Sequence, residues 1–201
     1  MGAPSGHRVP NSLIMSLTFR NAIRVDAERI AALVNSAYRG EQSRSGWTTE
    51  ADLLDGRRTD AREVRRLIAQ RNSIILLCQD GKKIVGSVHI EKTSDHASLG
   101  MFVVEPTRQG RGIGKRLLAC AEHVAQREWQ VDKIVMYVIT LRHELIAFYA
   151  RRGYRRTGVL QEFPVNPKMW QPKVSGLTFE ALEKNIRANL PQKRRKRGYA
   201  R

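Results

Sequence analysis

Residues 103–115 decide the fold; they read VVEPTRQGRGIGK and stand between two apolar segments. The preceding residues 99–104 predict a strand, which Pro106 ends. The following residues predict an amphipathic helix, because apolar side chains recur at helical spacing from Ile113 onward. The start of a helix offers unpaired backbone N–H groups and the positive end of its dipole, and both attract phosphate. Glycines in the turn let such a ligand approach the backbone, so we interpret the turn as a phosphate-binding loop.

Three known loop patterns compete for this turn. A dinucleotide-binding G-x-G-x-x-G needs one more residue before its last glycine than the chain has before Gly114. A Walker A loop needs a glycine where Gln109 stands and Ser or Thr where Arg116 stands. The pyrophosphate pattern Q/R-x-x-G-x-G/A fits residues 109–114 without exception. On these residues alone, a tight strand-to-helix turn without a ligand is the alternative.

The rest of the chain predicts one α/β domain. Helical spacing follows Asp26 and again Asp60, and a further helix is predicted at 143–152, with Gly153 as its left-handed C-cap. Strands are predicted at 74–78, 84–91, 99–104, 134–139, 154–160 and 177–182. A mixed sheet with helices on both faces accounts for this order.

Length and composition agree with a single globular domain of 201 residues that is 41% hydrophobic. We place the domain at 16–190, a flexible N-terminal extension at 1–15 and a basic, disordered tail at 191–201. Cys78 and Cys120 lie in apolar runs and are interpreted as core residues rather than as a disulfide. No apolar run approaches the roughly 20 residues of a membrane span. We also find no signal peptide and expect a cytoplasmic protein that does not bind membranes.

The charge is strongly positive, because 36 Lys and Arg face 19 Asp and Glu, which gives +17. Such a surface favours polyanionic partners. The run KRRKR at 193–197 has two functional interpretations, a nuclear import signal or a nucleic-acid tether, and a solvated tail is the alternative. Nucleic acid is the less favoured partner, since the tail has no aromatic residue for base stacking before Tyr199.

Three further segments join the loop in a family resemblance. Residues 99–106 (LGMFVVEP) look like a fourth strand with its strand-ending proline, and 145–154 (LIAFYARRGY) resemble an element with a spaced tyrosine and glycine. Residues 177–184 (LTFEALEK) look like a last strand. Together they resemble the GNAT superfamily of acetyl-CoA-dependent N-acetyltransferases over roughly residues 16–186. The resemblance implies a mixed, mostly antiparallel, twisted sheet with helices on both faces.

The resemblance also implies acetyl-CoA as co-substrate and no metal. The backbone at Met101 and Val103 would hold the pantetheine arm, and the N–H of Val103 would polarise the thioester carbonyl. Acetyl-CoA is a polyanion, so it explains part of the positive charge. The CoA pyrophosphate would lie on the loop formed by Gln109, Gly110, Arg111, Gly112, Ile113, Gly114 and Lys115.

Direct transfer of acetyl to an amine needs a neutral amine, a donor for the oxyanion and an acid for the departing thiolate. Tyr149 matches the tyrosine that commonly protonates the sulfur, and a phenol with a pKa of about 10 is protonated at neutral pH. A core aromatic is the alternative for Tyr149. Ser98 stands where some relatives carry a glutamate base, so His89 is the candidate base. A solvent-facing His89, or no dedicated base, are the alternatives.

The acceptor is expected to lie near the loop between the first two helices. Arg39, Arg44, Arg57 and Arg58 are candidates to bind a carboxylate or phosphate, and Trp47 either packs on the domain or walls the site. We expect a small-molecule primary amine that also carries negative charge. The alternatives are a protein N-terminus or lysine, and a non-catalytic module that binds CoA or nucleic acid. Arg142 replaces an asparagine of many relatives, and homodimers are common in the superfamily.

Overall fold

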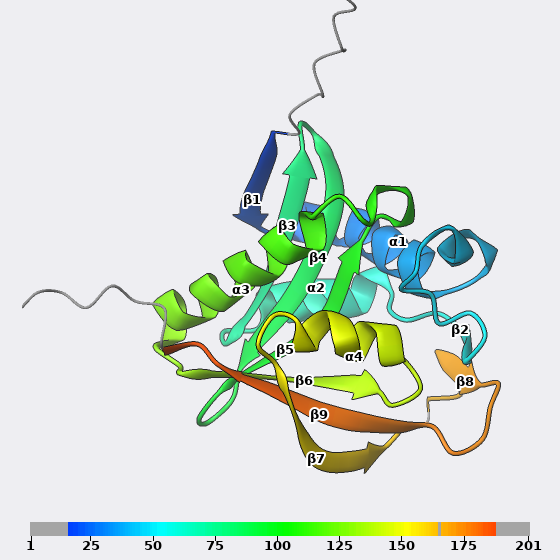
Figure 1. Cartoon of the computed structure of the whole chain (residues 1–201). Coiled ribbons are helices and arrows are strands. Elements are labelled where there is room, and N and C mark those ends of the chain that lie inside the picture. Colours follow the sequence, from blue (N-terminus) through cyan, green and yellow to red (C-terminus); the bar gives the residue numbers. More distant parts are fainter. Residues whose placement is uncertain (1–15, 165, 188–201) are drawn as a thin grey trace, which may run out of the picture.

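The computed structural model describes residues 16–164 and 166–187 (Figure 1). The extension expected at 1–15 and the tail expected at 191–201 lie outside the described residues. The helices are α1 (Ala27–Tyr38), α2 (Ala61–Ala69), α3 (Ile113–Trp129) and α4 (His143–Ala150). The strands are β1 (Leu17–Asn21), β2 (Leu54–Gly56), β3 (Ser73–Asp80), β4 (Lys83–Lys92), β5 (Ala97–Val104), β6 (Lys133–Ile139), β7 (Arg155–Glu162), β8 (Trp170–Pro172) and β9 (Thr178–Asn185).

Seven strands form one sheet in the order β1-β3-β4-β5-β6-β9-β7, and β2 pairs with β8 apart from it. Neighbours in the large sheet run antiparallel except β5 and β6, which run parallel. Parallel neighbours need a crossover connection, and α3 supplies it. The expected mixed, mostly antiparallel sheet is therefore confirmed.

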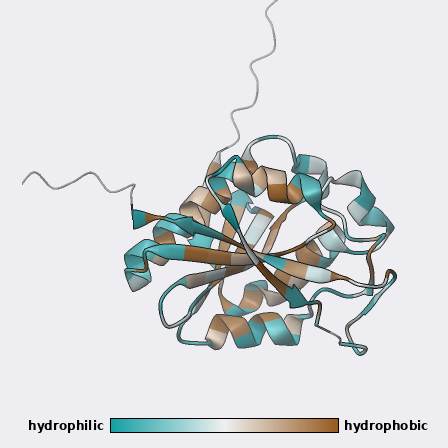
Figure 2. Ribbon diagram, turned by 60° about the horizontal axis from the view of Figure 1, so that its bottom comes forward, coloured by the Kyte–Doolittle hydropathy of each residue, from teal (hydrophilic) through white to brown (hydrophobic). Residues whose placement is uncertain are grey.

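Helices cover both faces of this sheet, with α1 and α2 on one face and α3 and α4 on the other (Figure 1). Strand β3 shows the cause, because Ile75 and Leu77 pack in the cluster of α1 and α2, while Leu76 and Cys78 pack in the cluster of α3. Side chains alternate across a strand, so a strand buried on both faces is apolar throughout. Figure 2 shows hydrophobic residues along the central strands and on parts of the helices.

Local chemistry sets the ends of the helices. The carboxylate of Asp60 accepts a hydrogen bond from the N–H of Glu63 at 2.8 Å, which caps α2. Gly112 precedes α3 with φ 78°, and Gly153 follows α4 with φ 87°, as the sequence predicted for Gly153. Within the residues that the structure describes, none of the helices combines the length and apolarity that a membrane crossing requires.

One irregularity opens the sheet at its centre. Strands β5 and β6 are paired only as far as Leu99 and Met136. On the other side of β5, the register with β4 shifts so that Met101 and Phe102 together oppose Val88, and Met101 has φ 43°. A bulge of this kind bends its strand. Strand β5 therefore turns away from β6 and leaves an opening between their ends.

Three short strands were not expected from the sequence. Strand β1 has five residues, and β2 and β8 have three each. Segments of this length carry too few residues for a recognisable alternation of apolar and polar side chains. They become strands because distant parts of the chain pair with them, β1 with β3 and β2 with β8.

Replacing Leu117 tests the packing of α3 on the sheet. Leu117 is 0% exposed within the larger core cluster, so Leu117→Ala is expected to lower the free energy of unfolding by about 2–5 kcal/mol. Urea denaturation followed by circular dichroism measures this loss. The control is His123→Ala on the exposed side of the same helix, with an expected change of no more than about 0.5 kcal/mol. Equal losses in the two variants would contradict the packing described.

Candidate active site

Two pockets meet at the opening between β5 and β6. The first, here the glycine-loop pocket, has a volume of about 340 Å³ and lies between the turn at 108–115 and α4. The second has a volume of about 280 Å³. Tyr38 and Phe102 line both pockets. The second is called the arginine pocket because three arginines line it: Arg39, Arg58 and Arg142.

The turn before α3 leaves room for a ligand against the main chain. Gly110 and Gly112 have φ of 77° and 78°, a left-handed conformation that favours glycine. A Cβ at either position would have no other atom within 4 Å, so the space beside the turn is open. Helix α3 begins at Ile113, and its first N–H groups have no carbonyl partner within the helix. Phosphate binds well at such a helix start.

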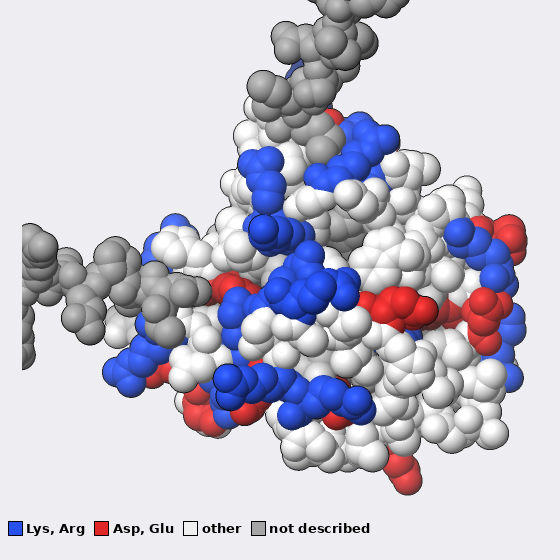
Figure 3. All heavy atoms as spheres, viewed as in Figure 1, with Lys and Arg blue, Asp and Glu red and all other residues white. Residues whose placement is uncertain are grey.

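Positive charge dominates the glycine-loop pocket. Arg108, Lys115, Arg151 and Arg152 line it, and no acidic side chain among the described residues does. Arg108 is partly neutralised by ion pairs, including one to Glu105 at 3.2 Å. Figure 3 shows Lys and Arg side chains gathered on the front face, over the region where α3 and α4 lie in Figure 1. The pocket therefore suits a polyanion.

Aromatic rings form the other side of this pocket. Trp47 packs on Phe148 with ring centroids 5.5 Å apart, and the guanidinium of Arg152 lies 3.4 Å from the Phe148 centroid. Burial, with Arg151 beside it, lowers the pKa of Arg152, whose Nε has no hydrogen-bond partner among the described residues. Trp47 thus packs on the domain, as one interpretation of the sequence had it, and lines the glycine-loop pocket rather than the arginine pocket.

Gln109 ties the glycine turn to the loop after α1. Its Nε2 donates to Thr48 Oγ1 at 2.8 Å and to the Val104 carbonyl at 3.0 Å, while its Oε1 accepts from the Trp47 N–H at 2.9 Å. Gly46 lies against it, and a Cβ there would come within 2.8 Å of Oε1. Gln109 lines the pocket, but its side chain is occupied by these protein groups. It therefore positions the loop beside the turn.

One buried carboxylate organises the arginine pocket. Glu50 is 8% exposed and accepts hydrogen bonds from Arg39 and, at 2.9 Å, from Arg142. Arg142 also donates to the Thr48 carbonyl at 2.6 Å. Two guanidinium groups against one carboxylate leave an excess of positive charge. They also occupy the carboxylate, so Glu50 is no free base.

Arg58 adds a third positive charge to this pocket. Its backbone N–H donates to Asn35 Oδ1 at 2.8 Å. Its guanidinium forms no hydrogen bond or ion pair with any residue that the structure describes. Glu50 is the single acidic residue lining the pocket among residues 16–164 and 166–187. A ligand that enters the pocket therefore meets net positive charge.

Two tyrosines stand near the junction of the pockets. The Tyr38 hydroxyl donates to the Phe102 carbonyl at 2.9 Å, and burial raises the pKa of Tyr38 to about 12. Tyr149 is 4% exposed, and its hydroxyl has no hydrogen-bond partner within the described part of the chain. Burial, with a smaller contribution from Tyr38, raises the pKa of Tyr149 far above its usual range. A buried phenol normally has a hydrogen-bond partner. The protonated hydroxyl of Tyr149 is therefore available to donate a hydrogen bond to a ligand.

Most, but not all, of the predicted cofactor-binding residues line the glycine-loop pocket. Arg111 is exposed and lines neither pocket, and Met101 lines the arginine pocket instead. The other predicted loop residues line the glycine-loop pocket: Gln109, Gly110, Gly112, Ile113, Gly114 and Lys115.

The register of β5 bears on Val103. Val103 is opposite Ser87 on β4. Two residues further along the chain, the N–H of Glu105 donates to the Val85 carbonyl at 2.9 Å. Because backbone groups alternate direction along a strand, the N–H of Val103 also faces β4. The geometry thus gives no support to Val103 as the group that polarises a carbonyl in the opening. Val104 has its backbone groups on the open side.

His89 lies apart from Tyr149. It lines neither pocket, and its Nε2 is 2.9 Å from Ser73 Oγ. It is opposite Ile75, which packs with α1 and α2, whereas Tyr149 belongs to the cluster on the other face. The expected role of His89 as a base therefore has no support in this geometry. Ser98, in contrast, does line the arginine pocket.

The sequence missed the buried network around Glu50. Arg142 stood out only as a departure from its relatives, and nothing in the local pattern connected it with Glu50, which is 92 positions away. Tyr38 was also missed, since a tyrosine near the end of a helix has no distinctive signal. A charged residue at a predicted helix start, such as Arg142, is the one clue that the sequence offered.

The fold and the two pockets define an α/β protein with a glycine-rich turn and lining cations beside a small polar pocket. The sequence matches the acetyltransferase (GNAT) family over residues 30–154, and the chain belongs to this family. Enzymes of the family use acetyl-CoA as co-substrate, so the protein is by class an acetyl-CoA-dependent N-acetyltransferase.

Solved structures share the fold. A chimera of the spermidine N-acetyltransferase SpeG from Vibrio cholerae and hSSAT has a TM-score of 0.61 and 19% identity, covering 85% of this chain and 95% of its own. The ribosomal-protein alanine N-acetyltransferase from Escherichia coli has a TM-score of 0.63 and 12% identity, covering 87% and 99%. A GNAT-family acetyltransferase from Streptococcus pneumoniae has a TM-score of 0.60 and 20% identity, covering 85% and 99%. A search of curated protein sequences found no match.

Breaking the Glu50 network should destabilise the protein. In Glu50→Gln two buried guanidinium groups lose their counter-charge, and the free energy of unfolding is expected to fall by about 3–5 kcal/mol. Urea denaturation measures the change. The control is Asp52→Asn, which removes an exposed partner of Arg44 and should leave stability unaltered. If both variants unfold at the same urea concentration as the wild type, the network contributes nothing.

His89 should make the fold sensitive to mild acid. Burial lowers the pKa of His89 in the folded state below its ordinary value of 6.5, so the unfolded chain takes up the proton first. Its contribution to stability is complete above about pH 6.5 and is lost as the pH falls below that value, by at most about 1.4 kcal/mol per pH unit. Urea midpoints at pH 7 and pH 5 should differ less in His89→Gln than in the wild type. An unchanged difference would refute this contribution.

Proposed function

We propose that this protein transfers the acetyl group of acetyl-CoA to the primary amine of a small molecule, by direct attack in a ternary complex. The observation that carries the proposal is the meeting of the two pockets at the opening between β5 and β6. Tyr149 stands there beside Phe102, with ring centroids 6.2 Å apart. A co-substrate in one pocket and an amine in the other would bring their reacting atoms together at this opening.

The glycine-loop pocket has the chemistry that acetyl-CoA requires. The first N–H groups of α3 and the cations of Lys115 and Arg151 attract the pyrophosphate. Gly110 and Gly112 leave the space that it needs. The pantetheine arm follows the edge of β5 that β6 leaves unpaired, where the N–H of Val104 faces it and Gln109 holds the Val104 carbonyl.

Tyr149 supplies the proton for the leaving group. The amine nitrogen bonds to the acetyl carbonyl carbon, the carbon–sulfur bond breaks, and the sulfur leaves as a thiol with the phenolic proton of Tyr149. The surplus proton of the nitrogen passes to water, and Tyr149 regains its proton from solvent. The raised pKa of Tyr149 keeps the hydroxyl protonated throughout the neutral range, so the proton is present when the sulfur departs.

No side chain is assigned as the base. Glu50 is occupied by two arginines, and His89 lies outside the arginine pocket. Three guanidinium groups around the amine favour its neutral form, because like charge lowers the pKa of an ammonium group. The acceptor therefore enters as the free amine or loses its proton to water.

The acceptor is a small amine that also carries negative charge. Arg58 offers an unpaired guanidinium, and Arg39 keeps a buried Nε without a partner among the described residues. A polycationic amine would find no free carboxylate, since Glu50 is already neutralised. The volume of about 280 Å³ is at the lower end for ligand pockets and favours a small molecule. A protein N-terminus is the alternative, because its first residue is of similar size.

Two substitutions separate binding from chemistry. Gly112→Glu places a side chain and a negative charge in the turn and should abolish acetyl-CoA binding in calorimetry. Gly81→Glu is the matched control, because Gly81 also has a left-handed φ, of 59°, but lies in the β3–β4 hairpin. Tyr149→Phe should bind acetyl-CoA as the wild type does and lower kcat by about 10²–10⁴-fold. Failure of the wild type to bind acetyl-CoA would refute the proposed function.

A further inference from the structure

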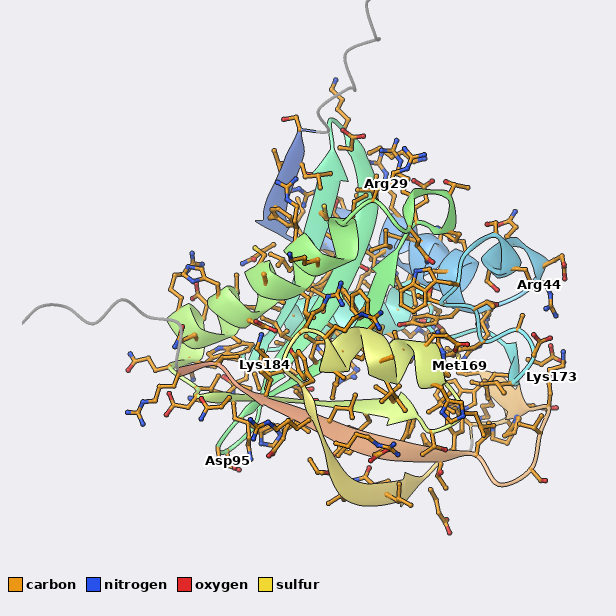
Figure 4. The ribbon with its side chains drawn as sticks, viewed as in Figure 1. Arg29, Arg44, Asp95, Met169, Lys173 and Lys184 are labelled. Atoms are coloured by element: carbon orange, nitrogen blue, oxygen red, sulfur yellow. The ribbon has the colours of Figure 1, made fainter. Side chains whose placement is uncertain are left out.

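The short pairing of β2 with β8, here called the clip, joins two segments that line the arginine pocket. Its ladder pairs Leu54 with Pro172 and Gly56 with Trp170. Further main-chain bonds extend the ladder beyond its three residue pairs. Arg57 N–H donates to the Met169 carbonyl at 2.6 Å, and Lys173 N–H to the Leu53 carbonyl at 2.9 Å. In Figure 4 the labelled Met169 and Lys173 lie beside β8, next to β2.

Gly56 allows this close approach of two backbones. A Cβ at Gly56 would lie 2.2 Å from the Met169 carbonyl oxygen and 3.0 Å from the Cα of Trp170. Both contacts are with main chain, which cannot move aside as a flexible side chain can. Gly56 also has φ 87°. A side chain at this position must therefore push β2 and β8 apart.

The clip holds two chemically different walls of the arginine pocket against each other. Arg58, with its unpaired guanidinium, follows β2 by two residues. Trp170 belongs to β8, and its Nε1 donates to the Pro164 carbonyl at 2.9 Å. Phe163 and Phe179 lie with Trp170 along the same side of the pocket, and the rings of the two phenylalanines are tilted against each other with centroids 4.9 Å apart. The pocket thus joins a cationic wall to an aromatic wall.

We propose that the clip determines acceptor specificity, and that it selects an amine that carries both an anionic group and an aromatic or large apolar group. The inference rests on the proposed transfer to an amine in this pocket. Arg58 pairs with the anionic group, since an unpaired guanidinium is a strong site for a carboxylate. Trp170 and Phe163 cover the apolar group, whose burial is favourable. An acceptor with only one of the two groups uses only one wall.

A panel of four amines tests this selection through the release of the CoA thiol. L-phenylalanine has both groups, phenethylamine lacks the carboxylate, L-alanine lacks the ring, and spermidine lacks both. We expect kcat/KM for L-phenylalanine to exceed that of each other amine by about tenfold or more. Spermidine or phenethylamine acting as well as L-phenylalanine would overturn the proposal.

Two variants test whether the clip and Arg58 are responsible for the preference for L-phenylalanine. Gly56→Ala should raise KM for L-phenylalanine about tenfold and leave the Kd for acetyl-CoA unchanged. The matched control is Gly81→Ala, where the φ is also left-handed but a Cβ meets nothing within 4 Å. Arg58→Gln should lower kcat/KM for L-phenylalanine about tenfold more than kcat/KM for phenethylamine, which has no carboxylate to pair with the guanidinium. Equal effects of Gly56→Ala and Gly81→Ala, or an unchanged preference in Arg58→Gln, would overturn the proposal.

Binding of N-acetyl-L-phenylalanine separates this inference from the proposed function, because it requires no turnover. Calorimetry should detect its binding to the wild type, weaker binding to Gly56→Ala and none to Arg58→Gln. Absence of binding to the wild type would refute the pocket chemistry, even if acetyl-CoA binds. Binding of N-acetyl-L-phenylalanine without binding of acetyl-CoA would refute the proposed acetyl transfer and leave the inferred chemistry of the arginine pocket intact.

Discussion

The parting of β5 from β6 is the constraint on which the rest of the structure depends. The two strands pair only to Leu99 and Met136, and the bulge at Met101 and Phe102 bends β5 away beyond that point. A continuous ladder would seal the centre of the sheet and leave no backbone group free there. The bulge instead produces an opening with a main-chain edge on one side. The glycine turn and α3 follow β5, so the bend also places the N-terminal end of α3 beside the opening.

The loop after α1 couples the two pockets. Gln109 holds Trp47 and Thr48 against the glycine turn, and Arg142 holds the same loop against α4. Glu50 then joins Arg142 to the end of α1 through Arg39. A shift of this loop would therefore change the positions of lining residues in both pockets. Its bonds join three segments that are distant in sequence, which makes the loop a structural part of the site.

Charge distinguishes this arginine pocket from one suited to a polyamine. Buried guanidinium groups are costly unless they are paired, and Glu50 neutralises only part of the positive charge. Arg58 and the Nε of Arg39 stay without partners among the described residues. Such groups are stable at the edge of a pocket when water or an anionic ligand reaches them. This chain shares its fold with a chimera of a spermidine N-acetyltransferase, but a shared fold does not by itself determine the acceptor.

The sequence by itself determined the elements whose signals are local. The glycine turn, the apolar strand before it, the cap at Asp60 and the left-handed Gly153 were all predicted, because each depends on a few neighbouring residues. The same local signals carried the family resemblance, and the spacing within it led to the prediction of Tyr149 as a site residue. They did not show where His89 lies in the fold, since a period-two pattern shows that a residue lies on one face of a strand without showing which layer covers that face.

Only the tertiary structure decided how distant residues meet. Glu50 and Arg142 are 92 positions apart, and their ion pair exists because α4 packs against the end of the loop after α1. The pairing of β2 with β8 depends on the close approach of Gly56 to the Met169 carbonyl. The residues next to Gly56 in the sequence do not indicate this contact. Contacts of this kind form only when a long loop of chain closes. They therefore produce no periodic pattern in the sequence. The sequence by itself thus predicted the glycine turn, whereas only the fold brought the residues of the arginine pocket together.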